Sequence, residues 1–267
     1  MTATASGDHA STFGDLLRDW RSRRRLSQLE LASDVDVSPR HLSFVETSRA
    51  TPSRALVLRL AEHLDIPLRD RNQMLLSAGF APVYPESSLH SPQMLAVREA
   101  LRDVLAGHDP YPMVVVDRWW NLVEANAGLQ RLMAGAAENL LQPPVNVLRV
   151  SLHPEGVAPL IVNLGEWRAH VLGRLRRQVR LTADPELADL LAELEAYPCD
   201  QPEHENPVTG EVMVKLRLRL PDGRQLALLS TVATFGTPLD VTVAELVIES
   251  FFPADVATGQ ILRDLAG

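Results

Sequence analysis

The stretch SQLELASDVDVSPRHLSFVETSRATPS, residues 27–53, decides the fold of the N-terminal part of this chain. It contains two helix starts in close succession. Ser27 and Glu30 have the spacing of a capping box, and Ser38 is an N-cap that proline follows directly. The apolar residues after each cap recur at helical spacing. The stretch therefore predicts two short helices joined by a tight turn at Asp36, which is a helix-turn-helix.

Further helices are expected on both sides of this pair. An apolar stripe with helical spacing begins at Phe13, another N-cap stands at Ser53, and a fifth helical segment ends at Gly79. These signals predict an all-α domain of five helices over residues 12–80. A disordered or flexible segment, residues 1–11, is expected to precede it.

The same stretch is similar to the xenobiotic-response-element family of helix-turn-helix regulators, the group of the lambda and Cro repressors. The similarity covers about residues 12–66 and includes Gln28, Ser38 and the Pro-Ser pair that ends the stretch. Asp36 stands where many members have glycine, but aspartate tolerates the left-handed conformation. The resemblance implies that the helix starting at Ser38 enters the major groove of double-stranded DNA.

The expected contacts with DNA follow from that placement. Arg40 is the strongest expected base contact, because a guanidinium matches the O6 and N7 acceptors of guanine. Arg25 and Arg49 are expected to bind phosphates, and Gln28 to bind the DNA backbone. The full set of expected DNA-binding residues is Arg25, Gln28, Ser38, Arg40, His41, Ser43, Thr47 and Arg49. The alternative is a helical bundle whose arginines are only solvated, or one that binds protein.

A second domain is expected after a linker. Residues 81–92, APVYPESSLHSP, contain three prolines and three serines, a composition typical of a linker. Residues 93–267 are expected to form an α+β domain. Within it, Val114–Val116 and Trp119–Glu124 are predicted as a pair of strands, with Asn126 at the start of the next helix.

Three later segments extend the predicted sheet. In VMVKLRLRL, residues 212–220, apolar and polar residues alternate, which predicts a half-buried strand. A turn at residues 221–223 and a returning strand over residues 225–234 complete a hairpin. VTVAELVIESFF, residues 241–252, is predicted as a third strand. Residues 138–200 are predicted to be mostly helical, so the sheet is expected to be antiparallel with a helical middle.

The early strand pair followed by Asn126 resembles the opening of a PAS sensor domain, and the region after the linker resembles the MmyB-like ligand-binding domain often attached to this helix-turn-helix family. The resemblance implies a PAS-like pocket for a fatty acid or a related acyl compound. A carboxylate or thioester head would need a polar partner, and Arg174 and His170 are the first expected partners, with Arg149 a third. The full set of expected ligand-binding residues is Trp120, Leu122, Asn126, Arg149, Trp167, His170, Val171, Arg174, Leu216, Leu218 and Phe251. The alternative is a filled apolar core without a cavity.

Charge and composition agree with two separate tasks. The net charge of −8 divides into +1 for residues 1–80, which hold 11 arginines and 10 acidic residues, and −9 for the remainder. No apolar run reaches the roughly 18 residues that a membrane span needs. The polar start of the sequence lacks the order of a signal peptide, and Cys199 is the only cysteine. A cytoplasmic protein without internal disulfides is therefore expected.

Together, the two resemblances predict a sequence-specific DNA-binding transcription regulator whose second domain senses a small apolar ligand. Because one recognition helix reads only a few base pairs, a homodimer on an inverted repeat is expected. The sequence contains no recognisable catalytic motif, and no cofactor or metal is expected. The alternative is a regulator whose second domain only dimerises or recruits a protein partner.

Overall fold

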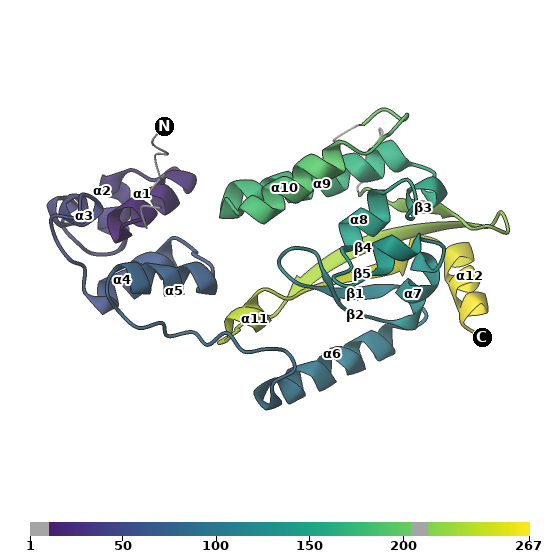
Figure 1. Cartoon of the computed structure of the whole chain (residues 1–267), viewed down its shortest axis with the longest axis horizontal. Coiled ribbons are helices and arrows are strands. Elements are labelled where there is room, and N and C mark those ends of the chain that lie inside the picture. Colours follow the sequence, from purple (N-terminus) through teal and green to yellow (C-terminus); the bar gives the residue numbers. More distant parts are fainter. Residues whose placement is uncertain (1–10, 204–212) are drawn as a thin grey trace, which may run out of the picture. The chain divides into compact units, whose positions relative to one another are not determined.

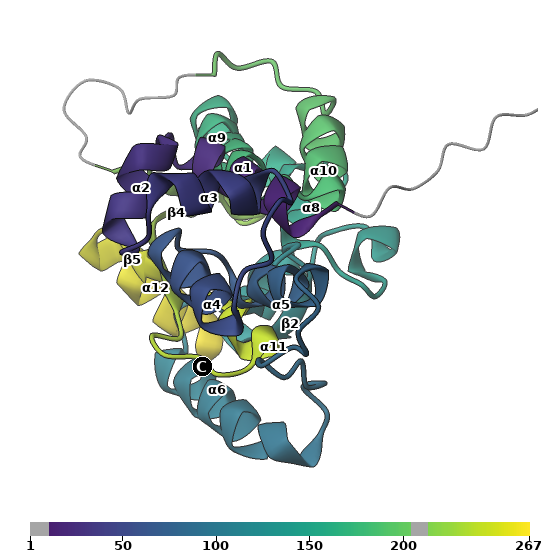
Figure 2. The same cartoon turned by 90° about the vertical axis from the view of Figure 1, so that its left-hand side faces the viewer.

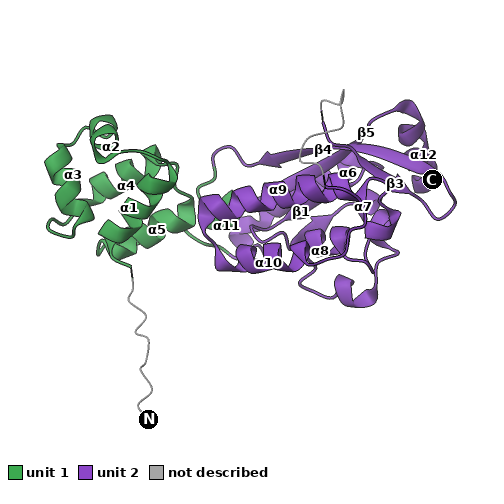
Figure 3. Cartoon of the chain, turned by 90° about the horizontal axis from the view of Figure 1, so that it is seen from above, with its two compact units in different colours: residues 1–87, 238–244 green, residues 88–237, 245–267 purple. Residues whose placement is uncertain are grey.

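The computed structural model describes residues 11–203 and 213–267 (Figure 1). The chain divides into two compact units, coloured separately in Figure 3, which are residues 1–87 with 238–244 and residues 88–237 with 245–267. Most of the N-terminal segment that was expected to be flexible lies outside the described residues. So does Val212, at the start of a predicted strand.

Unit 1 contains the five helices that the sequence predicts. They are α1 (Phe13–Arg23), α2 (Gln28–Asp34), α3 (Pro39–Glu46), α4 (Arg54–His63) and α5 (Leu68–Ser77). The predicted capping box is present, since Ser27 Oγ accepts a hydrogen bond from Glu30 N at 3.2 Å and Ser27 N donates one to the Glu30 carboxylate at 2.7 Å. Asp36 has a φ of 53°, the left-handed conformation expected for the turn. Fully buried leucines such as Leu17 and Leu42 fill the space between the helices.

A sixth, short helix of unit 1, α11 (Val241–Ala244), comes from late in the chain and packs against α5. The carboxylate of Asp240 caps it by accepting a hydrogen bond from Thr242 N at 2.8 Å, and also accepts one from Ser87 N at 3.1 Å. The prediction of one strand over residues 241–252 is therefore wrong at its start. The β-branched residues there favour a strand, but the cap and the packing on α5 turn them into a helix, and only the second half of the segment is a strand.

Unit 2 is an α+β domain with a five-stranded antiparallel sheet, as predicted, and its arrangement is consistent with a PAS-like domain (Figure 1). The strands are β1 (Met113–Val116), β2 (Leu122–Ala125), β3 (Leu216–Arg219), β4 (Gln225–Thr234) and β5 (Val247–Pro253), in the spatial order β2-β1-β5-β4-β3. The last strand in sequence lies at the centre, where Glu249 pairs with Val114 of β1 and with Val232 of β4.

Helices cover both faces of this sheet (Figures 1 and 2). On one face, α6 (Leu95–His108), which follows the short η1 (Pro92–Met94), packs against Met113 and Val115. The other elements are α7 (Ala127–Met133), η2 (Glu138–Leu141), α8 (Val147–Leu152), η3 (Ala158–Leu160), α9 (Leu164–Thr182), α10 (Pro185–Glu195) and α12 (Val256–Ala266). Side chains from α8, α9 and α10 form the larger core with Val114 and Val116 on the opposite face. Within the described ranges, no helix has the length and apolar character that a membrane crossing requires.

Two strands are shorter than predicted. β2 begins at Leu122 rather than Trp119, because Asp117 Oδ1 accepts hydrogen bonds from the backbone N–H groups of Trp119 and Asn121, both at 2.8 Å, and so lengthens the turn. β3 begins at Leu216, where Asn163 Nδ2 donates a hydrogen bond to Lys215 O at 2.8 Å and Asn163 Oδ1 accepts one from Arg217 N at 3.0 Å. The hairpin turn between β3 and β4 is confirmed, with Gly223 at a φ of 90°.

Candidate functional site

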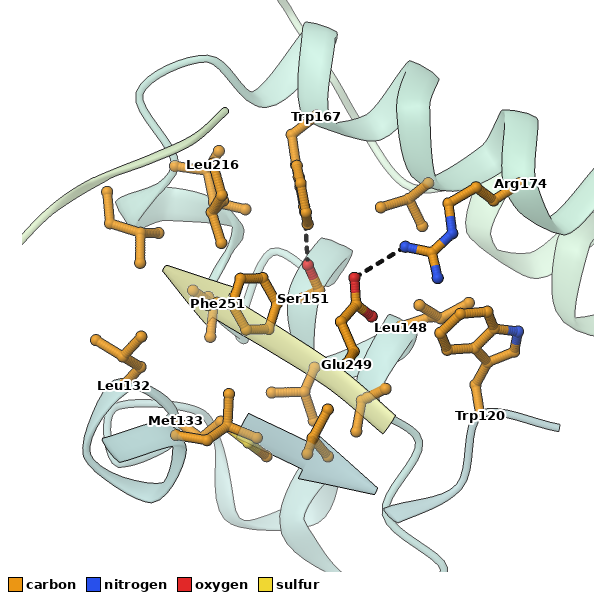
Figure 4. Close-up of a pocket in the computed structure, with 18 residues that line it drawn as sticks. Trp120, Leu132, Met133, Leu148, Ser151, Trp167, Arg174, Leu216, Glu249 and Phe251 are labelled. Atoms are coloured by element: carbon orange, nitrogen blue, oxygen red, sulfur yellow. Dashed lines mark hydrogen bonds and ion pairs between the residues drawn. The ribbon is translucent and has the colours of Figure 1, made fainter. Parts of the chain in front are cut away.

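A cavity lies in unit 2 between the sheet and the helices α7, α8 and α9 (Figure 4). Its volume is about 80 Å³, and its lining is apolar apart from Ser151, Arg174 and Glu249. The expected ligand-binding residues that line it are Trp120, Trp167, Val171, Arg174, Leu216, Leu218 and Phe251. The sequence was compatible with either a cavity or a filled apolar core at this place, and the structure contains a cavity.

Regular spacing in the sequence places these side chains on common faces. Trp167, Val171 and Arg174 follow one another at i, i+4 and i+7 on α9, so they project toward the sheet together. Glu249 and Phe251 are two residues apart on β5, so they project from the same side of the sheet. The cavity wall is therefore formed where one face of a helix meets one face of a central strand.

The polar part of the wall is an ion pair between the helix and the sheet. Arg174 Nη1 donates a hydrogen bond to Glu249 Oε1 at 2.8 Å. Glu249 is deeply buried, with 7% of its side chain exposed, and the Arg174 guanidinium lies over the Trp120 ring at 4.8 Å. Nearby, Trp167 Nε1 donates a hydrogen bond to Ser151 Oγ at 3.1 Å. Figure 4 shows both interactions on the cavity wall.

Four expected ligand-binding residues lie outside this lining. Leu122 lines a separate surface hollow beside β2. Asn126 is buried as the N-cap of α7, as the sequence predicts for its position. Arg149 forms an ion pair with Glu193 at 2.7 Å. The fourth residue is His170.

His170 is half-buried on α9, with its ring centroid 5.5 Å from that of Trp167. Burial is the main cause that lowers the pKa of His170, and the positive charge of Arg174 lowers it further. The imidazole is therefore neutral at neutral pH and offers no positive charge to an anion. Of the three expected partners for a head group, only Arg174 lines the cavity.

The size of the cavity limits what enters without movement. A cavity of about 150 Å³ holds benzene, so 80 Å³ accommodates only a short part of an acyl chain. Leu132 and Met133 of α7 form one wall. Methionine side chains repack readily because they are unbranched and flexible. A medium or long chain therefore requires outward repacking of this wall.

Two polar residues of the cavity were missed by reasoning from the sequence. Glu249 carries a usable signal, because it is an acid inside the apolar stretch VIESFF and has the strand spacing that puts it beside Phe251. Ser151 carries no such signal, since the short helix α8 that presents it has no distinctive pattern.

In unit 1, the outer side of α3 is the candidate DNA-binding surface. Arg40 is exposed there, with its guanidinium 5.3 Å above the ring of Phe44, a residue absent from the expected set. Ser38 Oγ accepts a hydrogen bond from His41 N at 3.1 Å, so its hydroxyl serves as the helix cap. Among the other expected residues, Arg25, Thr47 and Arg49 are exposed. Gln28, His41 and Ser43 are half-exposed.

A buried carboxylate fixes α3 within the bundle. Glu46, at the end of α3, is 2% exposed and accepts hydrogen bonds from Arg21 Nε and Gln28 Nε2, both at 2.6 Å. Its backbone oxygen accepts another from Arg18 at 2.9 Å. Gln28, an expected DNA contact, is therefore also part of the network that orients α3 against α1 and α2.

Comparisons with known proteins match both parts of the chain. A family model for the MmyB-like transcription regulator ligand binding domain matches residues 97–265, and a model for a helix-turn-helix domain matches residues 12–74. No curated protein matches the chain. A similar solved structure, entitled "Structure of an RNA-binding Light-Oxygen-Voltage Receptor", is 15% identical, with a TM-score of 0.30 over 94% of this chain. The match spans 62% of that protein's length.

Proposed function

Since the chain belongs to the family of MmyB-like transcription regulators, we propose that it binds an operator through α3 and senses an acyl compound in the cavity of unit 2. One observation carries the sensing part of the proposal. The cavity has an apolar lining drawn from β1, β3, β5 and three helices, and polar groups are confined to a small part of its wall. This combination suits a ligand with a chain and one polar end.

The chain of such a ligand supplies most of the binding free energy. Each buried methylene contributes roughly 0.8 kcal/mol, so affinity rises with chain length until the cavity and the repacked α7 wall are full. A fatty acid, or a derivative of one, is the class that the family resemblance implies.

The DNA part of the proposal rests on α3 and its flanks. Arg40 stands exposed on a helix whose two ends are fixed, at the start by the Ser38 cap and at the end by buried Glu46. Arg25 and Arg49 are exposed nearby in sequence and supply positive charge for phosphates. The protein would bind an inverted repeat as a homodimer whose main contact comes from unit 2. Sedimentation of the full chain measures whether it is a dimer, and a monomer at working concentration would contradict the homodimer.

The second candidate is a regulator whose unit 2 only dimerises or recruits a protein partner. The small cavity volume, about 80 Å³, favours this alternative. To separate the two, purified protein is incubated with a lipid extract, washed and examined by native mass spectrometry. A retained acyl compound supports sensing, whereas a spectrum of protein alone at every ligand concentration supports the alternative.

A further inference from the structure

The charges at the cavity are already compensated within the protein. Within the described part of the chain, the polar lining consists of Ser151, Arg174 and Glu249. The positive charge of Arg174 is paired with Glu249 at 2.8 Å and also lies over the Trp120 ring. Arg174 is the one cation in the lining among the described residues, so no uncompensated positive charge lines the cavity there. His170 lies outside the lining, and burial lowers its pKa.

A carboxylate head would therefore meet an unfavourable site. If it bound beside the ion pair, its charge would lie close to the buried carboxylate of Glu249, where like charges repel strongly. If it took Arg174 for itself, Glu249 would remain buried without its partner, which is the costliest arrangement for an ion pair. Both placements disfavour a free fatty acid.

The same groups favour a neutral head that both donates and accepts hydrogen bonds. Oε1 of Glu249 accepts the hydrogen bond from Arg174, and within the described ranges no protein group donates a hydrogen bond to Oε2. Ser151 Oγ accepts the indole N–H of Trp167, so its own hydroxyl hydrogen is available to a ligand. An N–H or O–H on the ligand suits Glu249, and an oxygen on the ligand suits Ser151.

We infer that the ligand of this cavity has a neutral head group that donates a hydrogen bond to Glu249, such as an acyl amide or a fatty alcohol, and is not a carboxylate. The inference rests on the proposed acyl-sensing function and narrows its ligand class. Glu249 is then the residue that determines head-group specificity. Arg174 holds the Glu249 side chain in position.

The test compares ligands that share one chain and differ only in the head. Decanamide, decanol, decanoic acid and methyl decanoate are titrated into the full chain by calorimetry at about pH 8, where a free fatty acid is ionised. Decanamide and decanol are expected to bind at least about tenfold more tightly than decanoic acid, equivalent to about 1.4 kcal/mol. The methyl ester, which cannot donate, is expected to bind more weakly than the amide.

Glu249→Gln tests the residue assignment. Removing the negative charge should raise the affinity for decanoic acid and leave that for decanamide little changed, so the preference narrows or reverses. Glu193→Gln is the matched control, because Glu193 pairs with Arg149 outside the cavity, and it should keep the wild-type ranking. Circular dichroism checks that both variants fold. The wild-type ranking decides the head-group class even if Glu249→Gln does not fold.

The outcomes separate this inference from the function on which it rests. Tighter binding of decanoic acid than of decanamide would overturn the neutral-head inference and leave acyl sensing standing. An unchanged ranking in folded Glu249→Gln would overturn the role of Glu249. Absence of binding by all four compounds, and by longer homologues, would contradict acyl sensing itself.

Discussion

Arg174 of α9 and Glu249 of β5 form an ion pair with a nitrogen–oxygen distance of 2.8 Å, and both side chains line the same cavity. The pair ties the longest helix of unit 2 to the central strand of its sheet. Two residues separate the start of β5 from the end of α11, which is part of unit 1. A ligand that moves β5 therefore acts on a strand that continues directly into the unit containing α3.

Removing one partner of this pair should destabilise unit 2. Arg174→Met leaves Glu249 buried and unpaired, and the expected loss is about 3 kcal/mol, the lower end for broken buried pairs because Arg174 is 21% exposed. The double variant Arg174→Met, Glu249→Met should recover most of this loss, since no charge then remains buried. Urea unfolding measures both. A single variant as stable as the wild type would show that the pair is not structurally important.

A larger side chain in the cavity should block ligand binding without changing the affinity of the protein for the operator. Val171→Phe adds volume on the α9 face of the cavity, at a packing cost of about 1–3 kcal/mol. Leu122→Trp is a suitable control, because Leu122 lies outside the lining. Calorimetry should detect acyl binding by Leu122→Trp and none by Val171→Phe. Equal binding by the two variants would place the ligand elsewhere.

The surface of α3 should carry the specificity for DNA. Arg40→Ala and His41→Ala are expected to lower specific operator affinity by about 1–3 kcal/mol for each lost base contact. Both positions lie outside the buried core, so the variants should fold. Arg102→Ala removes the same charge as Arg40→Ala from an exposed position on α6 and serves as the control. Fluorescence anisotropy measures the operator affinity of all three variants. If Arg40→Ala and His41→Ala bind the operator as tightly as Arg102→Ala does, α3 does not lie in the groove.

Acid should weaken unit 2 through His170. Because burial lowers the folded-state pKa of His170 below its ordinary value, the unfolded chain binds this proton more readily. The free energy of unfolding should therefore fall as the pH drops through about 6.5 toward the folded-state pKa. In His170→Gln this pH dependence should be smaller. Thermal unfolding between about pH 8 and pH 5 measures this dependence of stability on pH. An identical dependence in the wild type and in His170→Gln would contradict the neutral state expected for His170.

Local signals explain why the N-terminal helices could be predicted. The caps at Ser27, Ser38 and Ser53 each involve a side chain and a backbone group three residues away, so the sequence alone contains all of the interaction. The spacing of side chains along α9 is local in the same way. Trp167, Val171 and Arg174 are spaced by the helix itself, whatever the helix packs against.

Features that depend on distant parts of the chain were not predictable in this way. The segment after Asp240 is helical because it packs against α5, more than 160 residues earlier in sequence. The neutral state of His170 comes from its burial in the folded domain, which composition does not reveal. The pairing of Arg174 with Glu249 needs the order of strands in the sheet. The sequence therefore indicated a polar cavity residue on α9 but not the acid that faces it.

If unit 2 senses an acyl compound, occupancy of the cavity should control operator binding. The most direct test of this central claim is the operator affinity of the full chain, measured with and without a saturating acyl compound, after operator sequences are selected from random DNA. The affinity of the wild type should change by at least about fivefold, the lower end of typical allosteric coupling. The operator affinity of Val171→Phe should be the same with and without the acyl compound. An unchanged wild-type affinity, with calorimetry showing the cavity occupied, would contradict the claim.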